Sequence, residues 1–288
     1  MPQPQMLQPA TVEEAVQALS RRGAVPMAGA TDLLPSMRKG EIAPKLLVNL
    51  KTIPGLSEVR RARGGITIGA LTLVTDLLHD PVIAGTYPLL SEVAEHFASV
   101  QIRNLATIGG NLCNAAPSAD LALPLLVFDA RLQVHGPAGV REFDIADFFI
   151  NVNKTALRRG EILTSIILPR PRPRSGAAHA KLGVRQAMDL AFVGVAVALQ
   201  LAPGKKKSAS ARIALGSVAP IPMRARTAEL ILEGNPLTND LISQAAAAAA
   251  EESRPVSDLR ASAEYRRDMT EVLTRRALRE ALRRARKE

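Results

Sequence analysis

The spacing of apolar residues along the chain predicts a series of helices. Near the amino end, apolar residues recur at helical intervals from Val12 to Leu19, directly behind the capping-box sequence Thr11-Val12-Glu13-Glu14. A helix is therefore expected over residues 12–22, and Gly23 should end it. By similar spacing, or by runs of strong helix formers, further helices are predicted over residues 71–79, 87–100, 240–252 and 262–287.

Short apolar or alternating runs between these helices predict β-strands. Ile66, Thr67 and Ile68 follow the Gly64-Gly65 turn and alternate as a strand with one buried face does. Further strands are predicted over residues 25–28, 46–50, 161–169, 192–201 and 212–218. Residues 106–120 hold glycines, asparagines and a proline, so we expect a polar loop there that needs a partner for its backbone.

The order of these elements predicts an α+β chain in three parts. An N-terminal unit is expected over residues 1–55, a second unit over 56–170 and a C-terminal α+β unit over 176–288. The proline- and arginine-rich segment 170–175 has the composition of a linker between the last two. With 288 residues, 47% of them hydrophobic, the chain can bury a core of its own.

Charge is distributed unevenly along the chain, whose formal net charge is +10. Residues 158–226 carry 13 basic and 2 acidic side chains, whereas residues 1–157 carry 13 and 14. Nucleic acid, an acidic partner subunit or an anionic cofactor would each account for such a basic segment. Nucleic acid is disfavoured, because the sequence has neither zinc-finger spacing nor an RNA-stacking motif.

Composition also excludes several kinds of site. The single cysteine, Cys113, rules out an internal disulfide and a four-cysteine iron–sulfur cluster within the chain. The four histidines show no metal-ligand spacing, so no metal site is expected. No signal sequence and no apolar stretch of about 18 residues is present, and a cytoplasmic protein without a membrane span is expected.

Two segments, Met27–Leu33 and Ala106–Asn114, place small residues directly behind apolar runs. Small residues leave backbone N–H groups uncovered, and successive uncovered amides bind anions. With the Thr31 and Thr107 hydroxyls beside them, two such bends could hold a pyrophosphate without a lysine. The alternative interpretation is that each segment only turns the chain.

The same segments resemble those of the FAD-binding medium subunits of the molybdenum hydroxylases, the family of xanthine dehydrogenase and aerobic carbon monoxide dehydrogenase. Ala28 to Leu33 resembles the family's Ala-Gly-Gly-Thr-Asp/Ser-Leu loop. Thr107 to Asn111 resembles its Thr-Ile-Gly-Gly-Asn loop, behind Gln101-Ile102-Arg103-Asn104. Ala116 to Leu121 matches the stretch that supplies the family's ribose-binding aspartate. The resemblance extends over nearly the whole chain.

The resemblance implies a two-part FAD-binding domain of the vanillyl-alcohol-oxidase/PCMH type, followed by a smaller α+β domain of the carbon monoxide dehydrogenase flavoprotein type. It implies that Asp120 binds the ribose and that Lys181 lies beside the isoalloxazine and tunes its potential, with no acid–base residue required. The cofactor-binding residues that it implies are Ala28, Gly29, Ala30, Thr31, Asp32, Leu33, Thr107, Gly110, Asn111, Cys113, Asp120, Leu163 and Lys181.

Several of these residues have a second interpretation. Asp32 would repel a phosphate unless its carboxylate caps the following helix, which we favour. Asp120 could be only the N-cap of the apolar helix after it, Lys181 a solvated member of the basic segment and Cys113 a buried filler. Ala30 replaces the loop's usual second glycine, which costs about 1 kcal/mol if its φ is positive.

The function implied by the resemblance is electron transfer within a heterotrimeric-type molybdenum hydroxylase, expected as a dimer of heterotrimers. A large subunit would hold the molybdenum cofactor and a small one [2Fe-2S] clusters. The FAD of this chain would pass their electrons to an external acceptor such as NAD, a quinone or oxygen. The basic segment, Lys205–Lys207 included, is expected to face partner subunits or to counter the cofactor's charge. The alternatives are a stand-alone FAD oxidase and a flavin-free assembly or nucleic-acid-binding protein.

Overall fold

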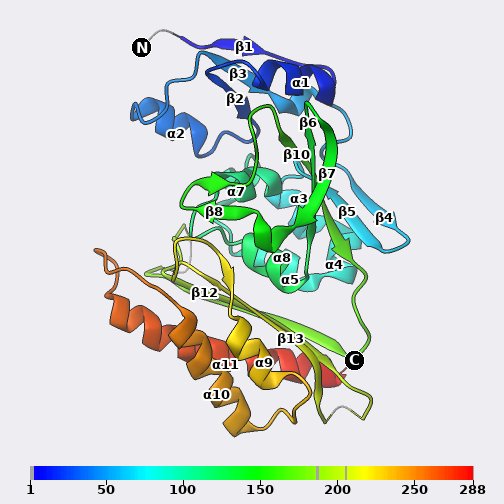
Figure 1. Ribbon diagram of the computed structural model, residues 1–288, viewed down its shortest axis with the longest axis vertical. Helices are drawn as coiled ribbons and strands as arrows, with labels where there is room; N and C mark the ends of the chain where they lie inside the picture. Colours follow the sequence, from blue (N-terminus) through cyan, green and yellow to red (C-terminus); the bar gives the residue numbers. More distant parts are fainter. Residues whose placement is uncertain (1–2, 186–187, 205, 288) are drawn as a thin grey trace.

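The computed structural model describes residues 3–185, 188–204 and 206–287. Figure 1 shows three units stacked along the long axis, with the N-terminal unit at one end and the C-terminal unit at the other. Each unit has its own sheet and its own hydrophobic cluster, and the mixture of helices and sheets confirms the α+β expectation.

The N-terminal unit is a three-stranded parallel sheet with two helices. The strand order is β1 (Gln5–Leu7), β3 (Leu46–Asn49) and β2 (Ala24–Met27), and the helices are α1 (Val12–Leu19) and α2 (Leu33–Arg38). The predicted capping sequence starts α1, because Thr11 Oγ1 accepts a bond from the Glu14 N–H at 3.2 Å. The helix stops at Leu19, before Gly23, and β1 was not predicted.

The second unit is built on a five-stranded antiparallel sheet in the order β4-β5-β10-β6-β7. Its strands are β4 (Val59–Ala62), β5 (Gly65–Gly69), β6 (Arg131–Gly136), β7 (Gly139–Asp144) and β10 (Ile162–Pro169), and β8 (Phe149–Asn151) pairs with β9 (Lys154–Thr155) beside them. Its helices are α3 (Val74–His79), α4 (Pro81–Thr86), α5 (Pro88–Glu95), α6 (Val100–Arg103), α7 (Ile108–Asn114) and α8 (Ala122–Val127).

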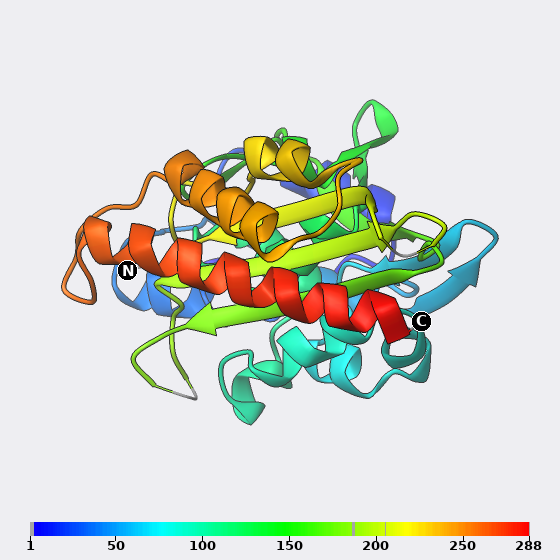
Figure 2. The same ribbon diagram turned by 90° about the horizontal axis from the view of Figure 1, so that it is seen from below.

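The C-terminal unit is a four-stranded antiparallel sheet with helices on one face. The strands run in the order β11 (Ser175–Leu182), β12 (Val193–Leu201), β13 (Ser208–Gly216) and β14 (Met223–Arg224), and the helices are α9 (Arg226–Leu232), α10 (Asn239–Glu252) and α11 (Ala263–Lys287). Figure 2 shows α10 and α11 lying across the sheet. Its other face packs on the second unit through α8 and α5.

The two faces of this sheet differ in side-chain size. Along β12, Val195 and Val197 belong to the cluster under the helices, whereas Ala196 packs into the core of the second unit. Gly194 and Gly216 lie opposite Leu123 of α8, and a Cβ on either would come within 2.9 and 3.1 Å of its side chain. Small residues on one face therefore let α8 approach the sheet closely.

Ion pairs hold the same interface, with the acids in the second unit and the bases in the C-terminal unit. Three of the basic residues, Lys181, Arg212 and Arg224, come from the basic segment. These three face the second unit of the same chain, so the expectation that they face partner subunits is wrong. Lys205 is outside the described residues, and Lys206 and Lys207 are exposed. The pairs are Asp120–Lys181 at 2.9 Å, Glu92–Arg284 at 2.8 Å, Asp129–Arg212 at 3.0 Å and Asp129–Arg224 at 2.8 Å.

None of the helices in the described part of the chain combines the length and the apolar character that a membrane crossing requires.

One histidine at this interface should make the stability of the fold depend on pH. His179 lies on β11, and its buried Nε2 has no hydrogen-bond partner among the described residues. Burial first, and then the charges of Lys181 and His96, lower the pKa of His179 to about 4. The unfolded chain binds a proton below the ordinary pKa of about 6.5, whereas the folded chain resists it until about pH 4.

We therefore expect the free energy of unfolding to fall as pH drops from about 6.5 to 4, by up to about 3 kcal/mol from this residue. Denaturant titrations give the free energy of unfolding at each pH. Its slope against pH across this range should be flatter for His179→Gln than for the wild type. The exposed His79 offers the matched control, and His79→Gln should keep the wild-type slope. Equal slopes in the two variants would show that His179 is not the source.

Candidate functional site

The first small-residue segment connects β2 to α2 and touches the second unit. A Cβ on Gly29 would lie 2.1 Å from the carbonyl oxygen of Leu105, in the connection between α6 and α7. No side chain fits in that space, so glycine alone permits the contact. Gly29 thereby fixes the position of the bend against the chain that leads into α7.

The next residue, Ala30, has φ of 59°, in the left-handed region. An L-residue with a side chain pays about 1–2 kcal/mol for this conformation relative to the right-handed one. Its carbonyl oxygen accepts the Leu34 N–H at 3.1 Å and so starts α2. Because φ is positive at this position, alanine in place of the family's usual glycine costs stability, as the sequence predicted.

The bend leaves a run of backbone donors unused. Among the described residues, no acceptor takes the N–H groups of the five successive residues Gly29, Ala30, Thr31, Asp32 and Leu33. Successive free amides on a left-handed bend form a concave cluster of partial positive charge. Such a cluster suits an anion with several acceptor oxygens, because each oxygen can take its own donor.

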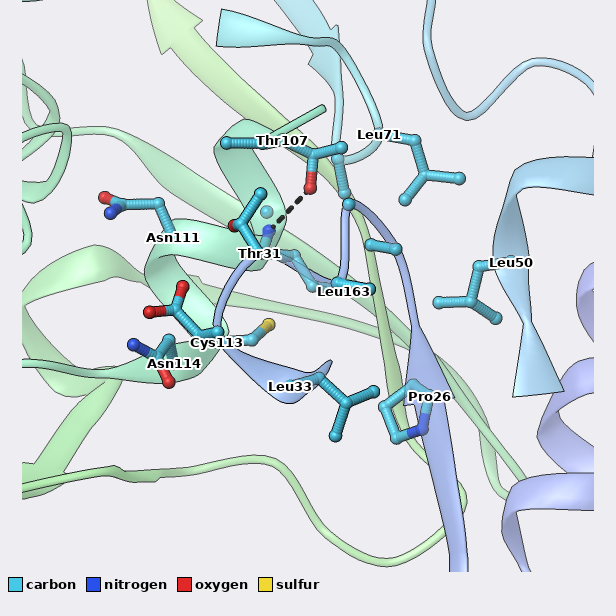
Figure 3. Close-up of a pocket in the computed structure, with 18 of the residues that line it drawn as sticks. Pro26, Thr31, Leu33, Leu50, Leu71, Thr107, Asn111, Cys113, Asn114 and Leu163 are labelled. Atoms are coloured by element: carbon cyan, nitrogen blue, oxygen red, sulfur yellow. Dashed lines mark hydrogen bonds between the residues drawn. The ribbon is translucent and has the colours of Figure 1, made fainter. Parts of the chain in front are cut away.

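The second segment differs from its prediction. Thr107 is the N-cap of helix α7 rather than part of a loop, and the four amides that follow it are all bonded within the chain. Thr107 Oγ1 takes the Gly110 N–H at 3.0 Å, the bond drawn as a dashed line in Figure 3. The expectation of uncovered amides in this segment is therefore wrong. The other three donors are Ile108 N–H to the Thr72 carbonyl, Gly109 N–H to that of Ala70 and Asn111 N–H to that of Thr107.

A cavity of about 280 Å³ lies between the two segments. Figure 3 shows Asn111 and Asn114 of α7 on one side of it, with Pro26 and Leu50 across from them. Of the predicted site residues, eleven line this cavity and only Asp120 and Lys181 do not. The eleven are Ala28, Gly29, Ala30, Thr31, Asp32, Leu33, Thr107, Gly110, Asn111, Cys113 and Leu163.

Asn114, Phe97 and Glu161 also line the cavity and were not predicted. Asn114 lies one helical turn after Asn111, so a helix prediction for this segment would have found it. Phe97 follows α5 and Glu161 lies two residues before Leu163, but neither belongs to one of the motifs that marked the site. Leu163 was predicted, and the ladder between β10 and β6 shifts register between it and Ser165, an irregularity typical of residues next to a site.

Three titratable side chains line the cavity, those of Asp32, Cys113 and Glu161. Asp32 stands at the N-cap position of α2, but its carboxylate accepts no bond from the helix amides, so the predicted cap is wrong. Burial raises the pKa of Asp32 above its ordinary value. Burial also raises the pKa of Cys113 to about 12, which keeps the sulfur as a thiol at neutral pH.

Asp120 and Lys181 lie elsewhere and contact each other. Lys181 Nζ is 2.9 Å from Asp120 Oδ2, and the two side chains are only 16% and 13% exposed. Burial raises the pKa of Asp120, and the charge and hydrogen bond of Lys181 oppose that shift. Both alternative interpretations are wrong, since the N-cap of α8 is Leu121 and Lys181 is not solvated.

Comparison with known proteins gives two matching families that together span most of the chain. Residues 2–171 match the FAD binding domain in molybdopterin dehydrogenase, and residues 178–281 match the CO dehydrogenase flavoprotein C-terminal domain. The carbon monoxide dehydrogenase medium chain of Afipia carboxidovorans is 35% identical, over 96% of each chain. A putative xanthine dehydrogenase FAD-binding subunit of Escherichia coli is 34% identical, over 95% of this chain and 94% of that one.

Solved structures resemble the whole chain. The match to carbon monoxide dehydrogenase from Hydrogenophaga pseudoflava has a TM-score of 0.95 at 33% identity and covers 98% of both chains. The match to quinoline 2-oxidoreductase from Pseudomonas putida 86 has a TM-score of 0.92 at 29% identity, over 99% of this chain and 98% of that one.

The Asp120–Lys181 pair can be tested by a double-mutant cycle. Lys181→Met should lower the free energy of unfolding by about 3–5 kcal/mol, because it leaves a buried carboxylate without its partner. Asp120→Asn/Lys181→Met should cost clearly less, because no charge then remains buried. Urea unfolding of the wild type, both single variants and the double variant measures the coupling. Additive costs would mean that the two side chains do not stabilise each other.

Proposed function

This chain belongs to the family of FAD-binding medium subunits of the molybdenum hydroxylases, and from this premise we propose that the bend from Gly29 to Leu33 holds the diphosphate of FAD. The observation that carries the proposal is the run of five unused amides beside the cavity. A diphosphate brings two negative charges and several acceptor oxygens, which matches a cluster of neutral donors. The cavity, at about 280 Å³, is near the lower end of the range of about 300–1,000 Å³ for small-molecule pockets, so it suits part of a dinucleotide.

The remaining cavity residues complete the proposed site. Thr31 adds a hydroxyl to the amide cluster, and Asn111 and Asn114 offer side-chain amides from α7. The Cys113 thiol, held neutral by burial, adds no charge beside the cofactor. When bound, FAD supplies one- and two-electron redox chemistry, and the protein contributes position and electrostatics.

The ion pair changes what Lys181 can contribute. A lone lysine beside a flavin would favour its reduced, negatively charged form. Because Asp120 lies 2.9 Å from Lys181 Nζ, most of that positive charge is compensated at short range. We therefore assign the pair a positioning role between the second and C-terminal units, with a weaker effect on potential than an unpaired lysine would have.

The chain acts as an electron-transfer subunit, and its relatives are medium subunits of complexes whose names refer to different substrates, among them carbon monoxide and xanthine. We therefore assign substrate recognition to another subunit. The proposed partners are a large molybdenum-cofactor subunit and a small [2Fe-2S] subunit in a dimer of heterotrimers, with an external electron acceptor. The cytoplasmic location stays a prediction of the sequence.

Flavin titration tests whether the bend from Gly29 to Leu33 binds the diphosphate. The purified chain, stripped of flavin, should bind FAD at least about tenfold more tightly than FMN, which lacks a diphosphate. Gly29→Ala should weaken FAD binding by at least about tenfold, because its Cβ forces the bend away from Leu105. In the control Gly85→Ala the added Cβ has no atom within 4 Å, so binding should not change. Equal affinities for FAD and FMN would show that the bend does not bind the diphosphate.

Anaerobic reduction tests the place of the chain in electron transfer. In the assembled complex, the substrate of the large subunit should bleach the flavin absorbance, because the [2Fe-2S] subunit links the two sites. The isolated chain with FAD should stay oxidised in the presence of the same substrate. Bleaching of the isolated chain would instead identify a stand-alone FAD oxidase.

A further inference from the structure

A stripe of arginines runs along the exposed side of α11, far from the flavin cavity. Arg276, Arg279, Arg283 and Arg286 follow one another at intervals of three and four residues, so their side chains share one side of the helix. All four are exposed. Figure 2 shows the C-terminal part of α11 extending past the start of α10, so α10 does not cover it.

A groove of about 630 Å³ lies where this part of α11 passes the beginning of α10. Its wall on α11 carries four basic residues, Arg279, Arg283, Arg286 and Lys287, and no acidic residue lines it within the part of the chain that the structure describes. The opposite wall is the N-terminal end of the 14-residue helix α10, where the helix dipole adds partial positive charge. The four basic side chains that line the groove outweigh Asp240 in the first turn of α10, so the groove is positively charged on its α11 side.

Some basic side chains at this end of α11 are already bonded to acidic groups of the chain. Arg284 turns inward and bonds the Ala177 carbonyl of β11 and the Glu92 carboxylate, and the bond to Glu92 ties α11 to the second unit. Arg283 pairs with Glu280 at 2.6 Å, and its hydrogen bond, with that of Arg284, lowers the pKa of Glu280 to about 2.

Two of the groove residues have no such partner. Arg279 and Lys287 make no ion pair or side-chain hydrogen bond within the described residues. Lys287 lies in the last turn of α11, where a positive charge complements the helix dipole. Arg279 lies two turns before the end, beyond the reach of that effect, so the fold gives no reason for its charge there.

We propose that this groove binds an acidic segment of a partner protein. Carboxylates would form paired hydrogen bonds with the Arg279 guanidinium and a charge contact with Lys287. A protein segment is favoured over nucleic acid because no aromatic side chain lines the groove for a base to stack on. The groove belongs to the C-terminal unit alone, so the proposal stands independently of the flavin site.

Binding of a labelled oligo-glutamate peptide to the full chain at physiological salt tests the proposal. Arg279→Glu/Lys287→Glu should weaken binding by at least about tenfold, because two attractive charges become repulsive. The control, Arg22→Glu/Arg267→Glu, makes the same change in net charge at exposed residues outside the groove and the arginine stripe and should change affinity by less than about threefold. Thermal melting and flavin content of both variants show whether they fold.

Equal losses in the two double variants would overturn the proposal, because binding would then follow net charge alone. Tighter binding of a single-stranded oligonucleotide than of the peptide, lost in the groove variant, would also overturn it in favour of nucleic acid. If charge reversal unfolds the chain, Arg279→Gln/Lys287→Gln replaces it and should still weaken peptide binding. A chain without flavin gives the same result in this assay, so failure of the flavin proposal is a separate outcome.

Discussion

The site depends on one backbone contact that only glycine permits. Gly29 lies so close to the Leu105 carbonyl that any side chain would occupy the same space. This contact brings the bend after β2 against the chain that enters α7 and so creates the cavity between them. The left-handed turn at Ala30 then points the following amides away from any strand or helix partner. An anion site arises here because close packing and unused donors coincide.

The two small-residue segments make different contributions to that site. The first offers free amides, whereas the amides at the start of α7 are already bonded to the carbonyls of Ala70 and Thr72 and to Thr107. Its side chains, Cys113 and Asn114 among them, form a wall instead. The sequence suggests two anion-binding loops. In the structure, only the first offers a cluster of donors, and it faces a wall formed by the side chains of helix α7.

Part of the excess of basic residues has an internal explanation. Acids of the second unit face bases of the C-terminal unit across an interface where the sheet presents glycines and alanines to α8. Small side chains allow the close approach, and the ion pairs at its edges compensate charges that would otherwise be buried alone. Of the remaining bases, Arg279 and Lys287 lie on the far side of α11 and make no ion pair within the described residues.

Local order was legible in the sequence, because a helix such as α1 is specified by its own apolar spacing and by Thr11 and Glu14 within one turn. The motifs around Gly29 and Thr107 likewise identified the family and most of the cavity wall. Only the tertiary structure decided that Thr107 starts a helix and that Asp120 meets Lys181. Both outcomes depend on groups distant in the chain, the carbonyls after β5 and a strand 61 residues further on, and no local pattern encodes which of them will meet.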